Sequence, residues 1–282
     1  MPRRLLPLSA ARVITVTTAL VICVAFWDFI WDMDVTDFTA SAFVPPRVPI
    51  VQSELPNSAR VPVLVELFTA EGCSICPPAD DTLRALEQDQ PVPGVEVIAL
   101  EMHVDYWNGA GWRDPYGLRQ LTNRQNDYIH LFRLENVYTP QMVIAGQTQV
   151  LGSDAAEARH EIARAAKGPR TSVEVSFQSA SVATVRVDAL PADAKESEIW
   201  MAITENNIES AVQAGENTGR TLKHMAVVRS LVLLGRVAPG EPTVYSMHLR
   251  FNPRWKRDDL KYVVFVQDRY SRQVWGATAV TP

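Results

Sequence analysis

The chain has 282 residues, which is enough for an export or membrane segment followed by one large domain or two small ones. It is 47% hydrophobic and 21% charged, as in globular proteins and unlike disordered ones. The net charge of -5 and the lack of a run of Lys and Arg argue against nucleic-acid binding, so we expect no nucleic-acid partner.

The N-terminal residues 1–43 carry the features of an export signal or a membrane anchor. Arg3, Arg4 and Arg12 precede an uncharged apolar run over residues 13–27. This run is short for a membrane-spanning helix, which needs about 20 residues, and it is typical of a signal peptide. Aromatic residues continue beyond it, so an uncleaved anchor that would make the membrane a partner stays open. Both alternatives predict a periplasmic or otherwise extracytoplasmic location, because the arginines stay in the cytoplasm.

Residues 44–60 are rich in proline and polar residues and predict a linker. From residue 61 the hydrophobic pattern alternates between strand-like and helix-like segments. The expected strands are residues 61–69, 95–104, 137–144 and 148–151, and the expected helices are 79–87, 118–134 and 153–166. This order predicts an α/β domain over residues 61–168, with a central mixed sheet flanked by helices.

Residues 169–282 differ in character, because strand-like runs follow one another with turn signals between them. The expected strands are residues 172–177, 182–190, 199–206, 227–237, 242–251, 262–267 and 273–280. The pattern predicts a separate all-β, sandwich-like accessory domain.

The chain has three cysteines, and Cys23 lies in the apolar N-terminal run. The remaining pair, Cys73 and Cys76, is separated by two residues on the turn between a predicted strand and a predicted helix. One pair is too little for a disulfide framework. A helix N-terminus presents unpaired N–H groups and a partial positive charge, and both favour a thiolate. The pair is therefore better explained by function than by stability.

A strand, a Cys-x-x-Cys turn, a helix and a later Thr139-Pro140 that opens a hairpin resemble the layout of the thioredoxin fold. Residues 65–154 resemble more closely DUF1223, an uncharacterised family of exported bacterial proteins. The matching segments are ELFTAEGCSICPPAD, HVDYWNGAGWRDP, the Arg124-Gln125 pair, VYTPQMV and GSD. The resemblance implies a thioredoxin-like domain but no established reaction.

The resemblance to thioredoxin-like proteins implies roles for five residues. Cys73 would be the nucleophile and Cys76 the resolving thiol. A cis bond before Pro140 would leave the backbone of Thr139 free to pair with an extended substrate. Glu66 is a candidate proton relay, although it is one residue out of register with the buried acid of thioredoxins, and the favoured alternative is a strand-end or paired carboxylate.

Further polar and aromatic residues are candidates for a ligand groove. His103 and Asp105 end the second predicted strand, where ligand crevices of open α/β sheets lie. His103 is open to acid/base chemistry, metal binding or a structural hydrogen bond. Trp107 and Trp112 can shape a substrate groove or cap the core.

Three other polar residues are expected to have ordinary structural roles. Asp80 lies in the first turn of the predicted helix, where the helix dipole favours an acidic residue. Arg124 is expected at the surface or paired with a loop. His224 follows a glycine-containing turn and is the most site-like residue of the β domain, although a solvated loop is the favoured expectation for it.

These patterns favour an exported or membrane-tethered thiol-disulfide oxidoreductase. Its partners would be a protein or small-molecule thiol or disulfide and an electron donor or acceptor, and it would need no cofactor beyond the cysteine pair. The alternative is a copper(I)-binding protein that uses Cys73, Cys76 and His103, a ligand set that with water would also suit zinc. A second alternative is an interaction module without catalysis, in which the β domain binds a partner.

Overall fold

The computed structural model describes residues 60–281 apart from residues 110, 180, 250 and 251. The expected signal or anchor segment and nearly all of the expected linker lie outside these residues. In the part of the chain that is described, no helix is long and apolar enough to cross a membrane.

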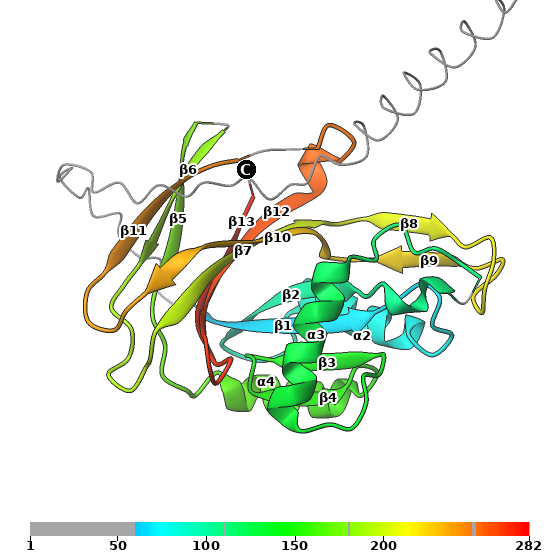
Figure 1. Ribbon diagram of the computed structural model, residues 1–282, viewed down its shortest axis with the longest axis horizontal. Helices are drawn as coiled ribbons and strands as arrows, with labels where there is room; N and C mark the ends of the chain where they lie inside the picture. Colours follow the sequence, from blue (N-terminus) through cyan, green and yellow to red (C-terminus); the bar gives the residue numbers. More distant parts are fainter. Residues whose placement is uncertain (1–59, 110, 180, 250–251, 282) are drawn as a thin grey trace, which may run out of the picture. The chain divides into compact units, whose positions relative to one another are not determined.

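The described chain is built mainly from strands, which are connected by a few helices (Figure 1). The strands are β1 (Val61–Thr69), β2 (Val95–His103), β3 (Gln141–Ile144), β4 (Thr148–Leu151), β5 (Val173–Ser179), β6 (Val182–Val187), β7 (Ser197–Glu205), β8 (Ile208–Ala211), β9 (Thr221–His224), β10 (Val227–Val237), β11 (Thr243–His248), β12 (Leu260–Asp268) and β13 (Val274–Val280). The helices are α2 (Pro77–Asp89), α3 (Arg119–Phe132), α4 (Ala155–Ala165) and two short 3-10 turns, η1 (Tyr106–Gly109) and η2 (Arg257–Asp259).

An eight-stranded mixed sheet forms the centre of the fold, in the order β13-β12-β7-β10-β2-β1-β3-β4. β1 runs parallel to β2, and β2 runs parallel to β10. The other neighbouring strands are antiparallel. A second sheet of three strands has the order β11-β6-β5, and β8 pairs with β9 in a separate hairpin.

β1 and β2 are buried on both faces, which explains their nearly continuous apolar sequences. On one face, Leu121 and Tyr128 of α3 join a core that includes Phe68 of β1. On the other face, Leu83 of α2 and Ile162 of α4 pack in a core with alternate residues of the two strands. Helices therefore cover both faces of this half of the sheet.

The structure differs from the expectation of a separate β domain after residue 168. β7, β10, β12 and β13 continue the same sheet, and β10 joins it at the edge of β2 through Val227 and Glu101. The core under α3 includes Val228 and Phe265 together with Phe68. The three-stranded sheet packs against the opposite face of these strands, as in a sandwich whose larger sheet is shared. The expected boundary therefore falls inside one continuous sheet.

Several local features follow from the residues at element ends. α2 begins at Pro77, earlier than expected, because proline is well tolerated in the first turn of a helix. Asp154 caps α4 by accepting a hydrogen bond from the backbone N–H of Glu157 at 3.0 Å. The Thr139–Pro140 peptide is cis, and β3 begins only after it. The short hairpin of β8 and β9 was not among the expected elements.

We expect a fragment of residues 60–282 to unfold in one cooperative transition. A fragment of residues 60–168 should show no such transition. The fragment loses the strand that pairs with the edge of β2 and the part of the α3 core that β10 and β12 supply. Circular dichroism melts of the two purified proteins test this. A sharp, reversible transition in the shorter fragment would show that it folds alone and would contradict the prediction.

Candidate functional site

Cys73 and Cys76 form a disulfide on the turn between β1 and α2, with their Cα atoms 5.4 Å apart. Cys76 immediately precedes the two prolines that open the helix. Both cysteines are buried, while Ser74 and Ile75 between them are exposed. Ile75 is 64% exposed, which places an apolar side chain at the tip of the turn.

Thr139 and Trp107 lie beside this disulfide. The Cys73 Sγ atom is 4.0 Å from the backbone carbonyl oxygen of Thr139, the residue that precedes Pro140. The indole N–H of Trp107 donates a hydrogen bond to the hydroxyl of Thr139 at 2.8 Å. A Cβ atom on Gly72 would lie 3.3 Å from the Trp107 Cβ, so the small residue before Cys73 allows this close approach. The structure thus brings Cys73, Thr139 and Trp107 together.

The loop between β8 and β9 also holds the cysteine turn. The buried side chain of Asn217 donates to the carbonyl oxygens of Glu71 at 2.8 Å and Cys73 at 2.9 Å. The Glu216 carboxylate accepts a hydrogen bond from the backbone N–H of Ser74 at 3.1 Å. Since these residues lie far away in the sequence, no local pattern could have assigned them to the site.

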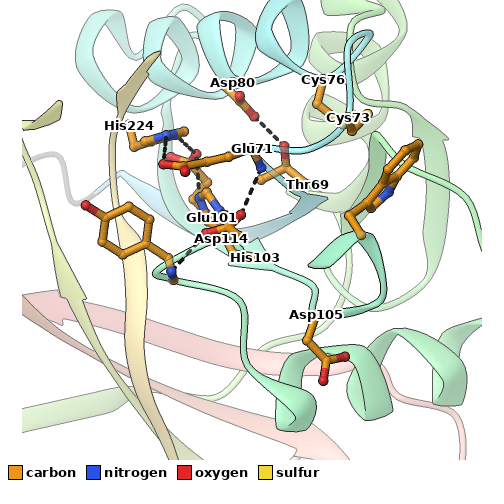
Figure 2. A network of polar contacts seen from close by, with 12 residues as sticks. Thr69, Glu71, Cys73, Cys76, Asp80, Glu101, His103, Asp105, Asp114 and His224 are labelled. Atoms are coloured by element: carbon orange, nitrogen blue, oxygen red, sulfur yellow. Dashed lines mark hydrogen bonds and ion pairs between the residues drawn. A yellow bond between two sulfur atoms is a disulfide. The ribbon is translucent and has the colours of Figure 1, made fainter. Parts of the chain in front are cut away.

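A buried network of ionisable side chains lies on the α2 face of the sheet, next to the disulfide (Figure 2). Glu101 on β2 is at its centre, with its Oε1 atom 3.2 Å from His103 Nε2 and 2.6 Å from His224 Nδ1. Its Oε2 atom accepts from the backbone N–H of Met225 at 2.8 Å. Asp114 Oδ2 lies 2.7 Å from the other ring nitrogen of His103. These four side chains thus bring two imidazoles and two carboxylates into direct contact.

Glu71 connects this network to the cysteine turn, because it is two residues before Cys73. Its backbone N–H donates to Asp114 Oδ2 at 2.8 Å, and its Oε2 accepts from the Trp112 indole at 2.6 Å. Its Oε1 lies 3.4 Å from His224 Nε2. Glu71 is fully buried, so it adds a third carboxylate to the interior next to the disulfide.

The charges in the network stabilise one another. Burial alone would lower the pKa of His224, but the charge of Glu101 and its hydrogen bond raise that pKa to about 9. Burial also opposes charge on His103, yet Asp114 and Glu101 raise the pKa of His103 well above its ordinary value. The pKa of Glu101 falls to about 2, because the two histidines outweigh the effect of burial.

Asp80 is a further buried acid in the first turn of α2, one helical turn after Cys76. The Thr69 hydroxyl donates to its Oδ1 at 2.7 Å. Burial and, secondly, the charge of Glu101 raise the pKa of Asp80 to about 7. The residue does lie in the first turn, as the helix-dipole argument expects, but its burial allows it to exchange a proton near neutral pH.

Glu66 lies on the opposite face of the sheet, toward α3. Its hydrogen bonds go to Arg124 Nε and Nη2, the latter at 3.0 Å, and to the hydroxyl of Tyr128 at 2.5 Å. Arg124 was expected at the surface or paired with a loop, and is instead buried in this ion pair with a strand residue. The proton-relay role of Glu66 stays a prediction, and none of its hydrogen bonds reaches a cysteine.

The four expected groove residues are divided among different places. His103 and Trp112 belong to the buried network, and Trp107 contacts Thr139. Asp105 lies apart from His103 (Figure 2) and binds Arg119 and Thr122 at the start of α3. The strand end therefore does not gather all four side chains into one groove.

The copper hypothesis requires His103 beside two free thiolates. Here both ring nitrogens of His103 face carboxylates and the two cysteines are bonded to each other. Over the residues that the structure describes, the side chains that could jointly hold a metal ion are Glu101, His103 and His224, without a cysteine. The copper-binding role of the cysteines remains a hypothesis.

His224, Asp114 and Glu71 are the network residues that sequence reasoning did not place. His224 was expected in a solvated loop but is 2% exposed, because it ends β9 next to the seam between β2 and β10. One signal was present in the sequence. Glu101 interrupts an apolar strand, and a carboxylate in such a strand is rarely buried without a partner. That signal does not identify His103 and His224 as the residues that pair with Glu101.

Comparison with known proteins gives the family. The family model described as "Protein of unknown function (DUF1223)" matches residues 64–267, which is more than half of the chain. The chain belongs to the DUF1223 family. No protein with a curated description matches it in sequence.

Solved structures show the fold of this DUF1223 member. A crystal structure of a protein from Agrobacterium tumefaciens is similar with a TM-score of 0.64 and 24% sequence identity, covering 79% of this chain and 96% of that one. A domain of the outer membrane lipoprotein Omp28 from Porphyromonas gingivalis has a TM-score of 0.23 and 10% identity, covering 40% of this chain and 88% of that one. This similarity is too low to indicate a shared fold. The first similarity shows a shared fold and no function.

We expect the stability of wild-type protein to fall relative to Asp80→Asn as the pH rises from 3.8 to about 7. The pKa of Asp80 is raised by folding, so its proton contributes stability that is complete below pH 3.8 and is lost as the pH rises through about 7. The shift corresponds to a difference of the order of 4 kcal/mol.

Urea unfolding of both proteins at about pH 4 and about pH 8, in buffer with a chelator, measures this difference. Asp81→Asn is the matched control, because Asp81 is the next residue of the helix but its side chain is 66% exposed. Parallel pH curves for wild type and Asp80→Asn would contradict the prediction.

Proposed function

We propose that this protein is an exported or membrane-tethered thiol-disulfide oxidoreductase that uses Cys73 and Cys76. The observation that carries the proposal is the cysteine pair at the start of α2, with Cys73 Sγ 4.0 Å from the Thr139 carbonyl oxygen. Export is proposed from the arginines and the apolar run of residues 1–27, which precede the described residues.

The proposed reaction begins with the reduced pair. The helix N-terminus favours the thiolate of Cys73, which attacks one sulfur of a substrate disulfide. The substrate S–S bond breaks, one substrate thiolate leaves, and a mixed disulfide with Cys73 forms. The Cys76 thiolate then attacks Cys73 Sγ, re-forming the Cys73–Cys76 bond and releasing the second substrate thiol. Two electrons pass to the substrate, and a thiol donor restores the pair.

The same steps in reverse oxidise a dithiol substrate and pass its electrons to a disulfide acceptor. Thr139 supports the assignment of Cys73 as the attacking residue, because its carbonyl oxygen faces that sulfur and can also accept a hydrogen bond from an extended substrate. The substrate class is therefore a thiol or disulfide, in a protein or a small molecule.

Asp80 is the proposed proton acceptor for the resolving thiol. Its backbone N–H bonds to the carbonyl oxygen of Cys76 at 3.1 Å, so the two residues share the first turn of the helix. Its pKa of about 7 allows it to take a proton from a thiol near neutral pH and return it. Glu66 is less suited to this role, because its carboxylate is held in an ion pair with Arg124.

Access to the disulfide depends on the segments around it. Both cysteines are buried, and Trp107 and the loop of Glu216 and Asn217 lie against the cysteine turn, so we expect a protein substrate to displace one of them. Ile75 is exposed at the tip of the turn and offers an apolar contact for a partner. A small disulfide would need a smaller displacement than a protein.

We expect reduced Cys76→Ser to accumulate a mixed disulfide with a disulfide substrate, because the second thiolate that resolves it is missing. Incubation of the reduced variant with oxidised glutathione, followed by mass spectrometry of the intact protein, measures the adduct. Cys73→Ser is the matched control and should accumulate much less. If the wild-type pair fails to interconvert between dithiol and disulfide at potentials of about -300 to -120 mV, the oxidoreductase proposal is wrong.

A second prediction separates the two acids. We expect Asp80→Asn to slow disulfide exchange and to remove the rise of its rate with pH through about 7, because the proton acceptor is lost. Glu66→Gln should leave that pH profile in place. Stopped-flow exchange of each reduced protein with a model disulfide gives both profiles. A wild-type profile in Asp80→Asn would exclude Asp80 from proton transfer.

A further inference from the structure

The two buried histidines have the same arrangement of partners. One ring nitrogen of each faces the shared Oε1 atom of Glu101. The other nitrogen faces an outer carboxylate, which is Asp114 for His103 and Glu71 for His224. Histidines that bind metal ions are commonly oriented in this way, with a carboxylate on the nitrogen that is not a ligand. The ligating carboxylate is usually hydrogen-bonded as well, and Glu101 Oε2 accepts from the Met225 N–H.

The network is not complete as a set of hydrogen bonds within the described chain. Glu71 Oε1 and His224 Nε2 lack a hydrogen-bond partner there, although both side chains are at least 98% buried. They face each other at 3.4 Å, which is a charge contact and not a hydrogen bond by geometry. Buried polar atoms without a partner are uncommon and costly. This observation points, independently of the residue types, to a ligand that reorganises the cluster.

We propose that Glu101, His103 and His224 bind a divalent transition-metal ion of the zinc class. Their candidate ligand atoms all lie within 4.8 Å of one another. Two imidazole nitrogens and one carboxylate oxygen form a donor set that zinc favours. Calcium and magnesium prefer oxygen ligands, and copper(I) prefers thiolates. Glu101 and His103 belong to one strand, so β2 supplies two of the ligands and the end of β9 supplies the third.

The distances require only local adjustment. A tetrahedral zinc ion with bonds of about 2.0–2.1 Å holds its ligand atoms roughly 3.3 Å apart. Glu101 Oε1 already lies 3.2 Å from His103 Nε2. Its 2.6 Å contact with His224 Nδ1 has to lengthen when an ion enters between the two atoms. If the His224 ring moves toward Glu71, its 3.4 Å contact with that carboxylate can shorten to a hydrogen bond.

The charges of the site also suit a cation. Glu71, Glu101 and Asp114 place three carboxylates in the interior, and a divalent ion can replace the two positive charges that protonated imidazoles supply in its absence. Binding replaces the imidazole protons that face Glu101, and these protons leave to solvent. The metal would link β2, β9 and the loop of Asp114 next to the cysteine turn. The site contains no cysteine, so it is independent of the proposed thiol chemistry.

The test uses the full chain after treatment with a chelator, followed by addition of zinc, desalting and elemental analysis. We expect stoichiometric zinc in the wild-type protein and a rise of its thermal midpoint on zinc addition. Glu101→Gln should lose the bound zinc and this rise. Asp114→Asn, which removes an outer carboxylate, should weaken binding by about 10–100-fold.

Glu66→Gln is the matched control, because it changes another fully buried carboxylate of the same sheet that lies outside the network. It should keep the wild-type zinc content. Circular dichroism of each variant separates loss of a ligand from loss of the fold. Should Glu101→Gln prove unfolded, competition of zinc with a chromophoric chelator for the wild-type protein still decides the proposal.

A cobalt(II) spectrum of the chelator-treated wild type gives a second measurement. Visible bands without sulfur-to-metal charge transfer are expected, as is full zinc binding by the Cys73→Ser/Cys76→Ser double variant. The proposal is overturned if wild-type protein binds no stoichiometric zinc, if a folded Glu101→Gln retains it, or if the double cysteine variant loses it.

Discussion

The arrangement of the molecule depends on the hydrogen bonds and ion pairs of the buried Glu101 carboxylate. Its backbone N–H bonds to Ala226 at 2.9 Å, where β10 joins β2, and its side chain bonds to the Met225 N–H and contacts both histidines. A carboxylate can be buried in this way only when hydrogen bonds and opposite charge offset its desolvation. Glu101 therefore ties the C-terminal strands to the α/β half at the seam of the sheet.

The cysteine turn depends on this seam. Asn217 and Glu216 hold the turn from a loop that is anchored by β9, and Glu71 links it to His224. The environment of the disulfide is therefore built by both halves of the chain. In the proposed oxidoreductase, the C-terminal half would control access to the cysteines, and in the proposed metal site it would supply a ligand. Both roles follow from the same contacts.

Much of the local structure could be predicted from the sequence, because it depends on nearby residues. The apolar runs predicted β1 and β2 nearly to the residue, and the helix expected over residues 153–166 contains α4. The short β8–β9 hairpin was missed, since strands of four residues carry little periodicity. In the site, the cysteine turn and His103 were identified, whereas Asp114 was part of a matched loop motif that does not reveal its contacts.

The sequence by itself determined most of the elements, the family and the position of the cysteine pair at a helix start. These are set by side-chain periodicity and by motifs within short stretches. Only the tertiary structure decided that the C-terminal strands continue the first sheet, that His224 is buried beside Glu101, and that Glu66 faces away from this network. The physical reason is that strand pairing and the burial of charge depend on which strands, distant in the sequence, become neighbours. The alternation of hydrophobic residues in a strand does not specify that neighbour.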